Sequence, residues 1–362
     1  MQSKAPPRQT ERHSQGTKPR RGLGSWIRRG LVWTIVGLLA LAVIGAIYQA
    51  IATEIDQRTY PPPGEVVDVG DHRLHINCVG QGSPTVILEA ANLGMSAHWV
   101  RVQQQVAQTT RVCAYDRAGM GWSERGPEPR DARQISSELH TLLKGAGTEG
   151  PYVLVGHSYG GLYARMYAAR YPDETAGVVL VDSSHPEQFT RSPEGRAMYE
   201  QARRLGAVLP FLTRLGVIRL SNFYPAHPDL PAQQRAQIEA FNSSTRQVGT
   251  TVEEFRATPE TNAQVRATGS LGDKPLAVVS AGEQSSSWLE MQDELTALSS
   301  NSIHRLVDGA TNESLLYDEC GDRAGGRRRA YRSATDPVNP AATNVGAQLT
   351  AVPKGTVISE HQ

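Results

Sequence analysis

Short apolar runs rich in β-branched residues alternate with segments of helical periodicity between residues 72 and 309. Runs of this kind predict buried strands, and strands that alternate with helices are typical of a mostly parallel sheet covered on both faces. One predicted helix covers residues 132–147, where leucine and isoleucine recur on a single helical face. The predicted strands are residues 72–77, 85–90, 111–116, 152–156, 177–182, 275–282 and 303–309.

The stretch between the strands that end at residue 182 and begin at residue 275 carries helical signals only. Residues 197–220 form an apolar helical pattern and residues 231–245 a polar one. Because structureless loops of such length are uncommon in compact domains, we predict a helical insertion at about 188–270 that lies over one edge of the sheet. Its apolar residues would line an acyl or lipid pocket or form the core of the insertion itself: Leu209, Phe211, Leu212, Leu215 and Ile218.

A third pattern is the uncharged run "LVWTIVGLLALAVIGAIYQAIA" at residues 31–52. A helix of this length crosses roughly 30 Å of hydrocarbon. Residues 1–30 are polar and hold eight lysines and arginines against one acid, so we expect a disordered cytoplasmic segment and a domain outside the membrane. The alternative is a cleaved signal peptide, for which "AIA" at 50–52 supplies the small residues of a cleavage site.

Overall charge and cysteine content narrow the classes of function. The net charge of +1 over 362 residues argues against general nucleic-acid binding. The three cysteines, Cys78, Cys113 and Cys320, match no zinc spacing, and we predict neither a metal nor a cofactor. In an oxidising compartment two of them would pair and leave one over.

The pentapeptide "GHSYG" at residues 156–160 fits the pattern Gly-x-Ser-x-Gly. It follows a predicted strand and precedes a helical pattern, which is the strand, turn and helix of a nucleophile elbow. Glycines flank the serine because a Cβ at either position would clash where the helix crowds the strand. We predict that Ser158 is a nucleophile. The alternative is an ordinary glycine-rich turn.

Acyl transfer also needs N–H donors for the developing oxyanion. One would be the backbone N–H of Tyr159, which follows the serine, and the other that of Asn92 in the loop after the strand at 85–90. A plain turn is the alternative for Asn92. The segment "YDRAGMGWS" at 115–123 predicts a tight loop nearby, in which we expect Asp116 and Arg117 to pair structurally without a catalytic role.

Taken together, "TVILEA", "YDRAGMGWS", "VLVGHSYGG" and "GVVLVDSSHPEQ", in this order, resemble the α/β-hydrolase superfamily and most closely its membrane-anchored bacterial members. The resemblance covers roughly residues 60–318. It implies an eight-stranded, mostly parallel sheet, a cap inserted after the sixth strand, and hydrolysis of esters, amides or related bonds through serine, acid and histidine. The substrate does not follow from the fold.

The chain departs from that family where the catalytic histidine should lie. The loop after the last strand reads "VDGATNESLLYD", and the expected histidine position holds Asn312. An asparagine side chain does not accept the serine's proton near neutral pH. Any replacement base would come from the histidines downstream of Ser158, with His185 the first to test: His185, His227, His304 and His361.

The acid is ambiguous as well. Many relatives carry an aspartate shortly after the seventh strand, where this chain has "AGEQSSSW" with Ser285 in the aspartate's place and Glu283 out of step. Other members use an aspartate at the end of the sixth strand, which Asp182 matches. We favour Asp182 over Glu283, and its alternative role is to cap the following turn.

Two further expectations follow from the resemblance. The second and fourth strands are neighbours in the family, so Cys78 and Cys113 would form a cross-strand disulfide, the alternative being two buried thiols. The family ends in an amphipathic helix, whereas residues 319–362 are rich in glycine, proline and arginine, so we predict either a disordered tail or a change of reading frame near Glu319.

The sequence therefore predicts a membrane-anchored serine hydrolase acting through Ser158 on a small-molecule or lipid-like acyl substrate. The alternative is a degenerate member that retains the fold and turns over little, because Asn312 replaces the base. A third hypothesis is a chain that does not fold stably, because loss of the last helix exposes apolar sheet surface. The sequence does not indicate the oligomeric state.

Overall fold

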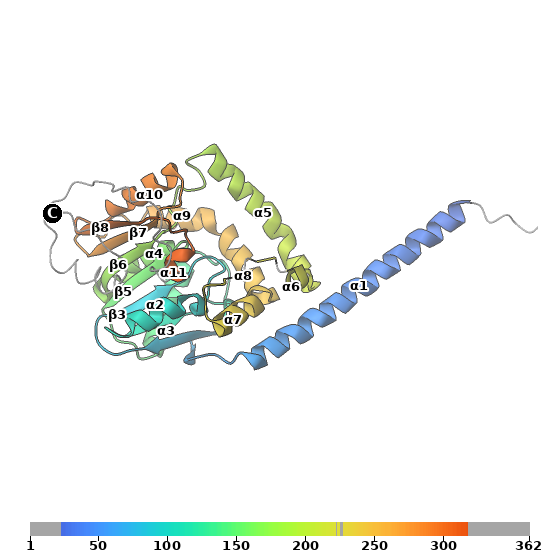
Figure 1. Cartoon of the computed structure of the whole chain (residues 1–362), viewed down its shortest axis with the longest axis horizontal. Coiled ribbons are helices and arrows are strands. Elements are labelled where there is room, and N and C mark those ends of the chain that lie inside the picture. Colours follow the sequence, from blue (N-terminus) through green and yellow to red (C-terminus); the bar gives the residue numbers. More distant parts are fainter. Residues whose placement is uncertain (1–22, 222, 225–226, 318–362) are drawn as a thin grey trace, which may run out of the picture. The chain divides into compact units, whose positions relative to one another are not determined.

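The computed structural model describes residues 23–221, 223–224 and 227–317, so the predicted tail at 319–362 and most of the basic segment at 1–30 lie outside the described residues. Its core is one eight-stranded sheet in the order β1-β2-β4-β3-β5-β6-β7-β8, in which every pair from β4 to β8 is parallel (Figure 1). This confirms the predicted α/β-hydrolase architecture. The strands are β1 (Glu65–Asp68), β2 (Arg73–Val79), β3 (Thr85–Glu89), β4 (Val112–Tyr115), β5 (Tyr152–His157), β6 (Thr175–Val181), β7 (Leu276–Ala281) and β8 (Ser302–Val307).

Helices cover both faces of the sheet. Leucines of α3 (Ala132–Gly145) and Tyr167 with two alanines of α4 (Gly160–Arg170) pack with Leu295 of α10 (Ser286–Thr296) in one apolar cluster. The other cluster joins the opposite strand faces to η1 (Ser96–Trp99), α2 (Val100–Val106) and α11 (Ser314–Tyr317). The central strands β3 to β6 are buried along nearly their whole length, which explains their continuous apolar runs.

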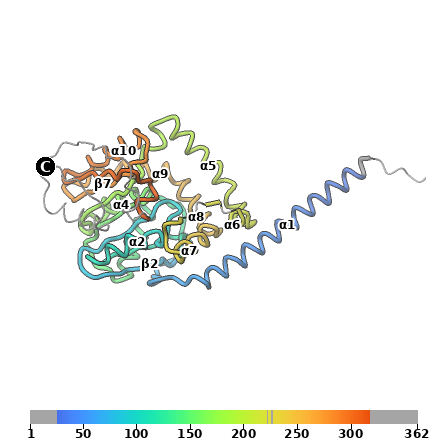
Figure 2. Tube along the Cα trace, viewed as in Figure 1, coloured from blue at the N-terminus to red at the C-terminus, as the bar shows by residue number. Residues whose placement is uncertain are grey.

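The predicted helical insertion lies between β6 and β7 (Figure 2). Ser192 begins its long first helix, because the Ser192 side chain accepts a hydrogen bond from the N–H of Gly195. A short link after Arg214 contains Gly216, which has a positive φ of 74°. The helices of this cap are α5 (Pro193–Arg214), α6 (Val217–Ser221), α7 (Ala232–Asn242), α8 (Thr245–Arg256) and α9 (Thr258–Arg266).

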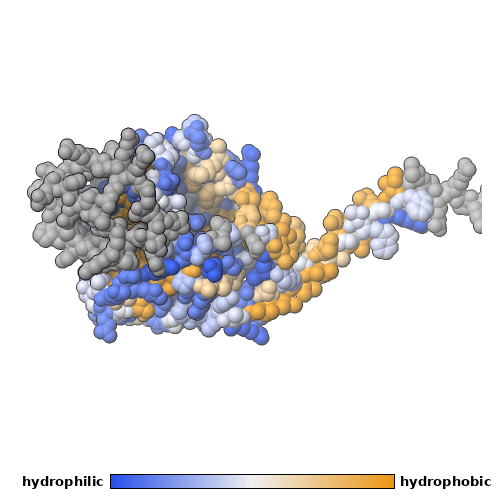
Figure 3. All heavy atoms as spheres, viewed as in Figure 1, coloured by the Kyte–Doolittle hydropathy of each residue, from blue (hydrophilic) through white to orange (hydrophobic). Residues whose placement is uncertain are grey.

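The first helix, α1 (Leu23–Thr59), is longer than the predicted span at 31–52. Its polar end remains helical because Glu54 and Arg58 pair one turn apart, and three prolines follow from residue 61. Among the described helices, α1 is the one long and apolar enough to cross a membrane, and its apolar side chains lie on the surface (Figure 3). Residues up to Ile44 form a unit of their own, whereas the part from Gly45 onward belongs to the main domain.

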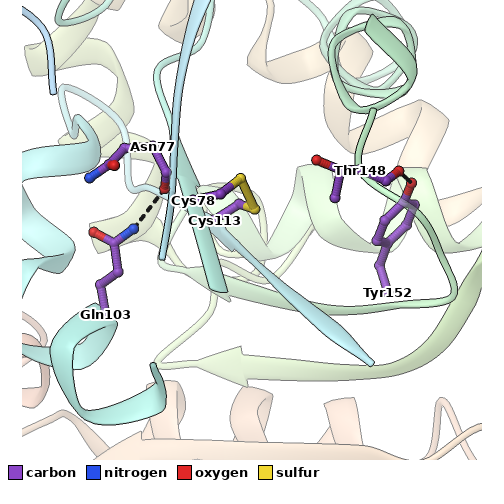
Figure 4. Close-up of a disulfide and its surroundings, with 6 residues drawn as sticks. All are labelled: Asn77, Cys78, Gln103, Cys113, Thr148 and Tyr152. Carbon is purple, nitrogen blue, oxygen red and sulfur yellow. Dashed lines mark hydrogen bonds between the residues drawn. A yellow bond between two sulfur atoms is a disulfide. The ribbon is translucent and has the colours of Figure 1, made fainter. Parts of the chain in front are cut away.

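The predicted disulfide between Cys78 and Cys113 is present (Figure 4). The two residues face each other in the antiparallel pair of β2 and β4. Gln103 of α2 also holds β2 next to the disulfide, because its side-chain amide donates to the backbone carbonyl of Asn77, 2.7 Å away. The cross-link therefore ties the antiparallel edge of the sheet to its parallel part.

Candidate active site

The turn after β5 has the geometry of a nucleophile elbow. Ser158 has a positive φ of 51°, and its N–H donates to the carbonyl of Val181 on the neighbouring strand at 3.0 Å. A non-glycine residue in this conformation is strained and is typical of functional sites. A Cβ on Gly156 would lie 2.5 Å from the carbonyl oxygen of Gly160, and one on Gly160 would lie 2.3 Å from that of Glu89. The two glycines are therefore required by the close approach of α4 to β5 and β3.

Ser158 lines a pocket of ≈ 180 Å³ together with both asparagines that the sequence singled out. Asn92 comes from the loop after β3, and Asn312 comes from the loop after β8. Histidine and aromatic side chains complete much of the wall: His98, Trp99, His157, Tyr224, His227 and Tyr317.

The two expected oxyanion residues have different surroundings. The Asn92 side chain points toward the cap, with its Nδ2 atom 3.4 Å from the carboxylate of Glu254. The ring of Tyr159 is buried, and its hydroxyl lies 3.1 Å from that of Thr258. Neither side chain is thereby directed at the serine, so any role of these residues in acyl transfer rests on their backbone N–H groups.

A buried arginine holds the loop that carries Asn92. The guanidinium of Arg117 donates to the carbonyls of Ala90 at 2.7 Å and Ala91 at 2.9 Å. It also binds the carboxylates of Glu89 and Glu254, each at 2.8 Å. Burial raises the pKa of Glu89 to about 7, although Arg117 counteracts it. Arg117 thus joins the loop after β3 to the cap helix α8.

The expected pairing of Asp116 with Arg117 is wrong. The Asp116 carboxylate instead lies 2.8 Å from Nδ1 of His75 and accepts hydrogen bonds from the N–H groups of Ser96 and Trp122. Adjacent residues on an extended strand end point to opposite sides, so the two side chains reach different partners. Both have structural surroundings, and neither lines the Ser158 pocket.

Asp182 lies at the end of β6 and is fully buried, with a positive φ of 40°. One carboxylate oxygen accepts from the indole N–H of Trp288 at 2.8 Å and from the N–H of Ala281 at 3.3 Å. The other accepts from the amides of Gln284 and Asn312, both at 2.7 Å. A buried carboxylate needs such donors, and all four here are neutral.

Asn312 therefore bonds to Asp182 and lines the same pocket as Ser158. Its backbone carbonyl accepts a hydrogen bond from Nε2 of His157 at 2.8 Å. Burial lowers the pKa of His157, so this ring is neutral at physiological pH and donates from Nε2. His157 thus fixes the loop after β8 against the elbow.

The comparisons with known proteins agree with the observed fold. The sequence model described as "alpha/beta hydrolase fold" matches residues 84–318, which is more than half of the chain. The chain belongs to the α/β-hydrolase fold family. A solved thermophilic esterase from Thermogutta terrifontis superposes with a TM-score of 0.52 at 20% identity, covering 68% of this chain and 88% of the esterase.

Curated relatives of this chain share only part of their length with it. An uncharacterized protein of Schizosaccharomyces pombe is 28% identical over 296 residues, which are 72% of this chain and 54% of the relative. An uncharacterized vacuolar membrane protein of Saccharomyces cerevisiae is 28% identical over 139 residues, which are 33% of this chain and 22% of that protein. The chain thus spans about half or less of the length of these two relatives.

The histidines proposed as replacement bases lie in different places in the structure. His185 is outside the pocket, and its Nε2 lies 3.7 Å from the carboxylate of Glu294. His304 on β8 binds the hydroxyl of Ser280 at 2.8 Å, also away from the pocket. His227 of the cap does line the pocket, and its Nδ1 lies 3.9 Å from the carboxylate of Glu313. His361 lies outside the described residues.

The two other positions considered for the catalytic acid, Glu283 and Ser285, have different contacts from Asp182. Glu283 is exposed, and its N–H donates to the carbonyl of Ala310. Ser285 begins α10, because its hydroxyl accepts from the N–H of Trp288. Neither residue lines the Ser158 pocket.

Sequence reasoning missed His98 and His157 in the pocket wall and the donors Gln284 and Trp288 on Asp182. Burial lowers the pKa of His98 to about 3, so it too is neutral. His157 was the most accessible to prediction, because it directly precedes the serine. The part of the chain that the structure describes contains no group of three or more histidine, cysteine or carboxylate side chains arranged to hold a metal ion.

Proposed function

We propose that this α/β hydrolase carries a serine acyl-hydrolase site, with Ser158 as nucleophile and Asp182 as acid, from which the general base has been lost. The observation that carries the proposal is the 2.7 Å hydrogen bond between the Asn312 amide and the Asp182 carboxylate beside Ser158. This is the contact that a catalytic histidine would make through its Nδ1–H. The substrate would be a small-molecule or lipid-like acyl compound.

Chemistry at this site is limited by proton transfer. In a complete triad the imidazole accepts the serine's proton as the hydroxyl attacks the carbonyl carbon, and it returns that proton to the leaving group. The Asn312 amide nitrogen has no basic lone pair, so the Ser158 hydroxyl remains protonated and a weak nucleophile. The N–H groups of Tyr159 and Asn92 would still stabilise an oxyanion, which leaves residual turnover only.

The test follows hydrolysis of a short-chain p-nitrophenyl ester by the full chain in detergent micelles. We expect Asn312→His to raise kcat/KM by roughly hundredfold or more, the usual contribution of a positioned general base. The double variant Asn312→His with Ser158→Ala is the matched control and should lose that gain. If Asn312→His gains nothing while remaining folded, the proposed placement of the base is wrong.

The chain as written supplies a second control. Ser158-dependent turnover close to that of a complete hydrolase would contradict the loss of the base. His227 would then be the residue to replace first, because it lines the pocket and His185 does not.

For the location of this site we propose a membrane-anchored domain with the N-terminus cytoplasmic and the hydrolase domain outside. The basic residues before α1 and the length of its apolar stretch support this orientation. The disulfide also supports it, because such bonds persist in oxidising compartments.

A further inference from the structure

The cap carries apolar side chains on its outer surface. On α5, residues three and seven positions apart lie along one side of the helix, and α6 continues the apolar surface. Phe211 and Leu220 are 59% and 69% exposed. We call this surface the outer cap face, and it consists of Met198, Leu205, Val208, Phe211, Val217, Leu220 and Phe223.

The opposite side of α5 is already occupied by the cap itself. A Cβ added to Gly206 would lie 3.4 Å from a methyl group of Val252 on α8, so α5 packs closely there. The outer cap face is therefore not part of the apolar core of the insertion. Soluble proteins seldom leave such a contiguous apolar surface without a partner.

The domain end of α1 packs directly beside this face. A Cβ on Gly45 would lie 2.3 Å from the carbonyl of Leu215, in the link between α5 and α6. Arg219 of α6 forms an ion pair with Asp56 at 2.7 Å, and the Gln49 amide donates to the carbonyl of Ser243 at 2.8 Å. All these residues belong to the same unit, so α1 from Gly45 onward and the cap form one body.

This part of α1 also exposes an apolar stripe. Ile47, Ile51 and Ile55 follow one another at intervals of four residues, and each is more than half exposed. The stripe belongs to the helix whose length and composition fit a membrane span. Figure 3 shows apolar surface over the cap end at α6 and over α1.

The charge of α5 and α6 fits the same environment. The segment 193–221 contains five arginines and two glutamates. Arg204 and Arg214 are exposed on α5. Basic side chains beside apolar ones are typical of helices that lie in the lipid headgroup layer, where they meet anionic lipids.

We propose that the outer cap face rests in the headgroup and upper acyl region of the bilayer that α1 crosses. The inference rests on the proposed membrane anchorage and is independent of the catalytic proposal. The occupant is the lipid bilayer, because the face continues the surface of the helix that enters it. Phe223 is followed by Tyr224, which lines the Ser158 pocket, so the face ends at the wall of that pocket.

The test uses spin labels on the full chain reconstituted into phosphatidylcholine vesicles that contain a minority of phosphatidylglycerol. Single cysteines replace Phe211, Leu220, Leu39 and Thr141 in a Cys320→Ser background with the disulfide intact. Leu39 reports insertion of α1, and exposed Thr141 on α3 is the control for the aqueous surface. Collision rates with oxygen and with a water-soluble nickel chelate give a depth parameter, positive in hydrocarbon and negative in water.

We expect positive depth parameters at Phe211, Leu220 and Leu39 and a negative one at Thr141. Negative values at both Phe211 and Leu220 with a positive value at Leu39 would overturn the outer cap face while leaving the anchor intact. A negative value at Leu39 would overturn the anchorage and, with it, this inference. Two cap positions are labelled so that a misfolded variant at one leaves the other to decide.

Discussion

Reduction of the bond between Cys78 and Cys113 should lower the stability of the domain by a predictable amount. The bond closes a loop with a sequence separation of 35 residues. In the chain-entropy treatment, opening such a loop returns about 13 cal/mol/K to the unfolded chain, or about 4 kcal/mol at 25 °C. This is a large part of the roughly 5 to 15 kcal/mol that stabilises an ordinary domain.

The perturbation should be chemical reduction rather than substitution. Cys113 is fully buried among core residues, so replacing it with alanine would add a packing loss to the effect of the cross-link. The assay is urea unfolding of the full chain in detergent, followed by tryptophan fluorescence, to which buried Trp99 contributes, with and without reductant. A Cys320→Ser variant is the control, because only the paired cysteines then respond.

Two results would refute this reasoning. Free thiols, trapped by alkylation in intact cells and counted under denaturing conditions without reduction, should number one, from Cys320. A count of three would exclude the disulfide and remove its support for an extracytoplasmic domain. A fall of less than about 1 kcal/mol on reduction would show that the cross-link does not constrain the unfolded chain as the loop length requires.

Two other predictions concern buried charges. Burial lowers the pKa of His75, but the attraction and hydrogen bond of Asp116 outweigh it and raise the pKa overall. The pair therefore stabilises the fold fully below about pH 6.5, and this contribution declines as the pH rises through the raised value, with a slope of at most about 1.4 kcal/mol per pH unit. Urea titrations should show this slope as the pH rises above about 6.5, the ordinary histidine value, and His75→Gln should abolish it; an unchanged slope would contradict the assignment. Glu254→Gln leaves the buried Arg117 with one carboxylate fewer and should cost about 3 kcal/mol in unfolding free energy, whereas the exposed Glu239→Gln should change it by about 0.5 kcal/mol or less; equal effects would contradict a structural role for the pair.

Strands and elbow could be predicted because their signals are local. Each buried strand is an uninterrupted apolar run, and the turn at Ser158 is encoded in adjacent glycines whose contacts the structure displays. The first strand, Glu65–Asp68, was not predicted, since it lies at the edge of the sheet, is mostly exposed and has only two apolar residues. The other edge strand, β8, was predicted at 303–309 because it is longer and carries three apolar residues, so the local pattern fails where a strand is both short and mostly exposed.

Partners that come from distant segments could not be predicted in the same way. Arg117 binds Glu254 across 137 residues of sequence, and nothing near either residue indicates the other. The contacts of Gln284 and Trp288 with Asp182 could have been predicted, because the segment that follows β7 comes after a parallel strand next to β6. Side chains from such loops meet at one edge of the sheet, which is where Asp182 lies.

If the proposed site is right, the environment of Asp182 explains why the single substitution Asn312→His should be enough to supply a base. Its carboxylate is fully buried and accepts from four neutral donors, so an asparagine at position 312 leaves no oxygen of this carboxylate unsatisfied. An imidazole at position 312 would donate to the same oxygen through its Nδ1–H. The bond from His157 goes to the backbone carbonyl of residue 312 and is therefore retained by any side chain there. The loop is thus held in place by contacts that the substitution does not alter, and Nε2 of the new imidazole is the atom left to accept the proton of Ser158.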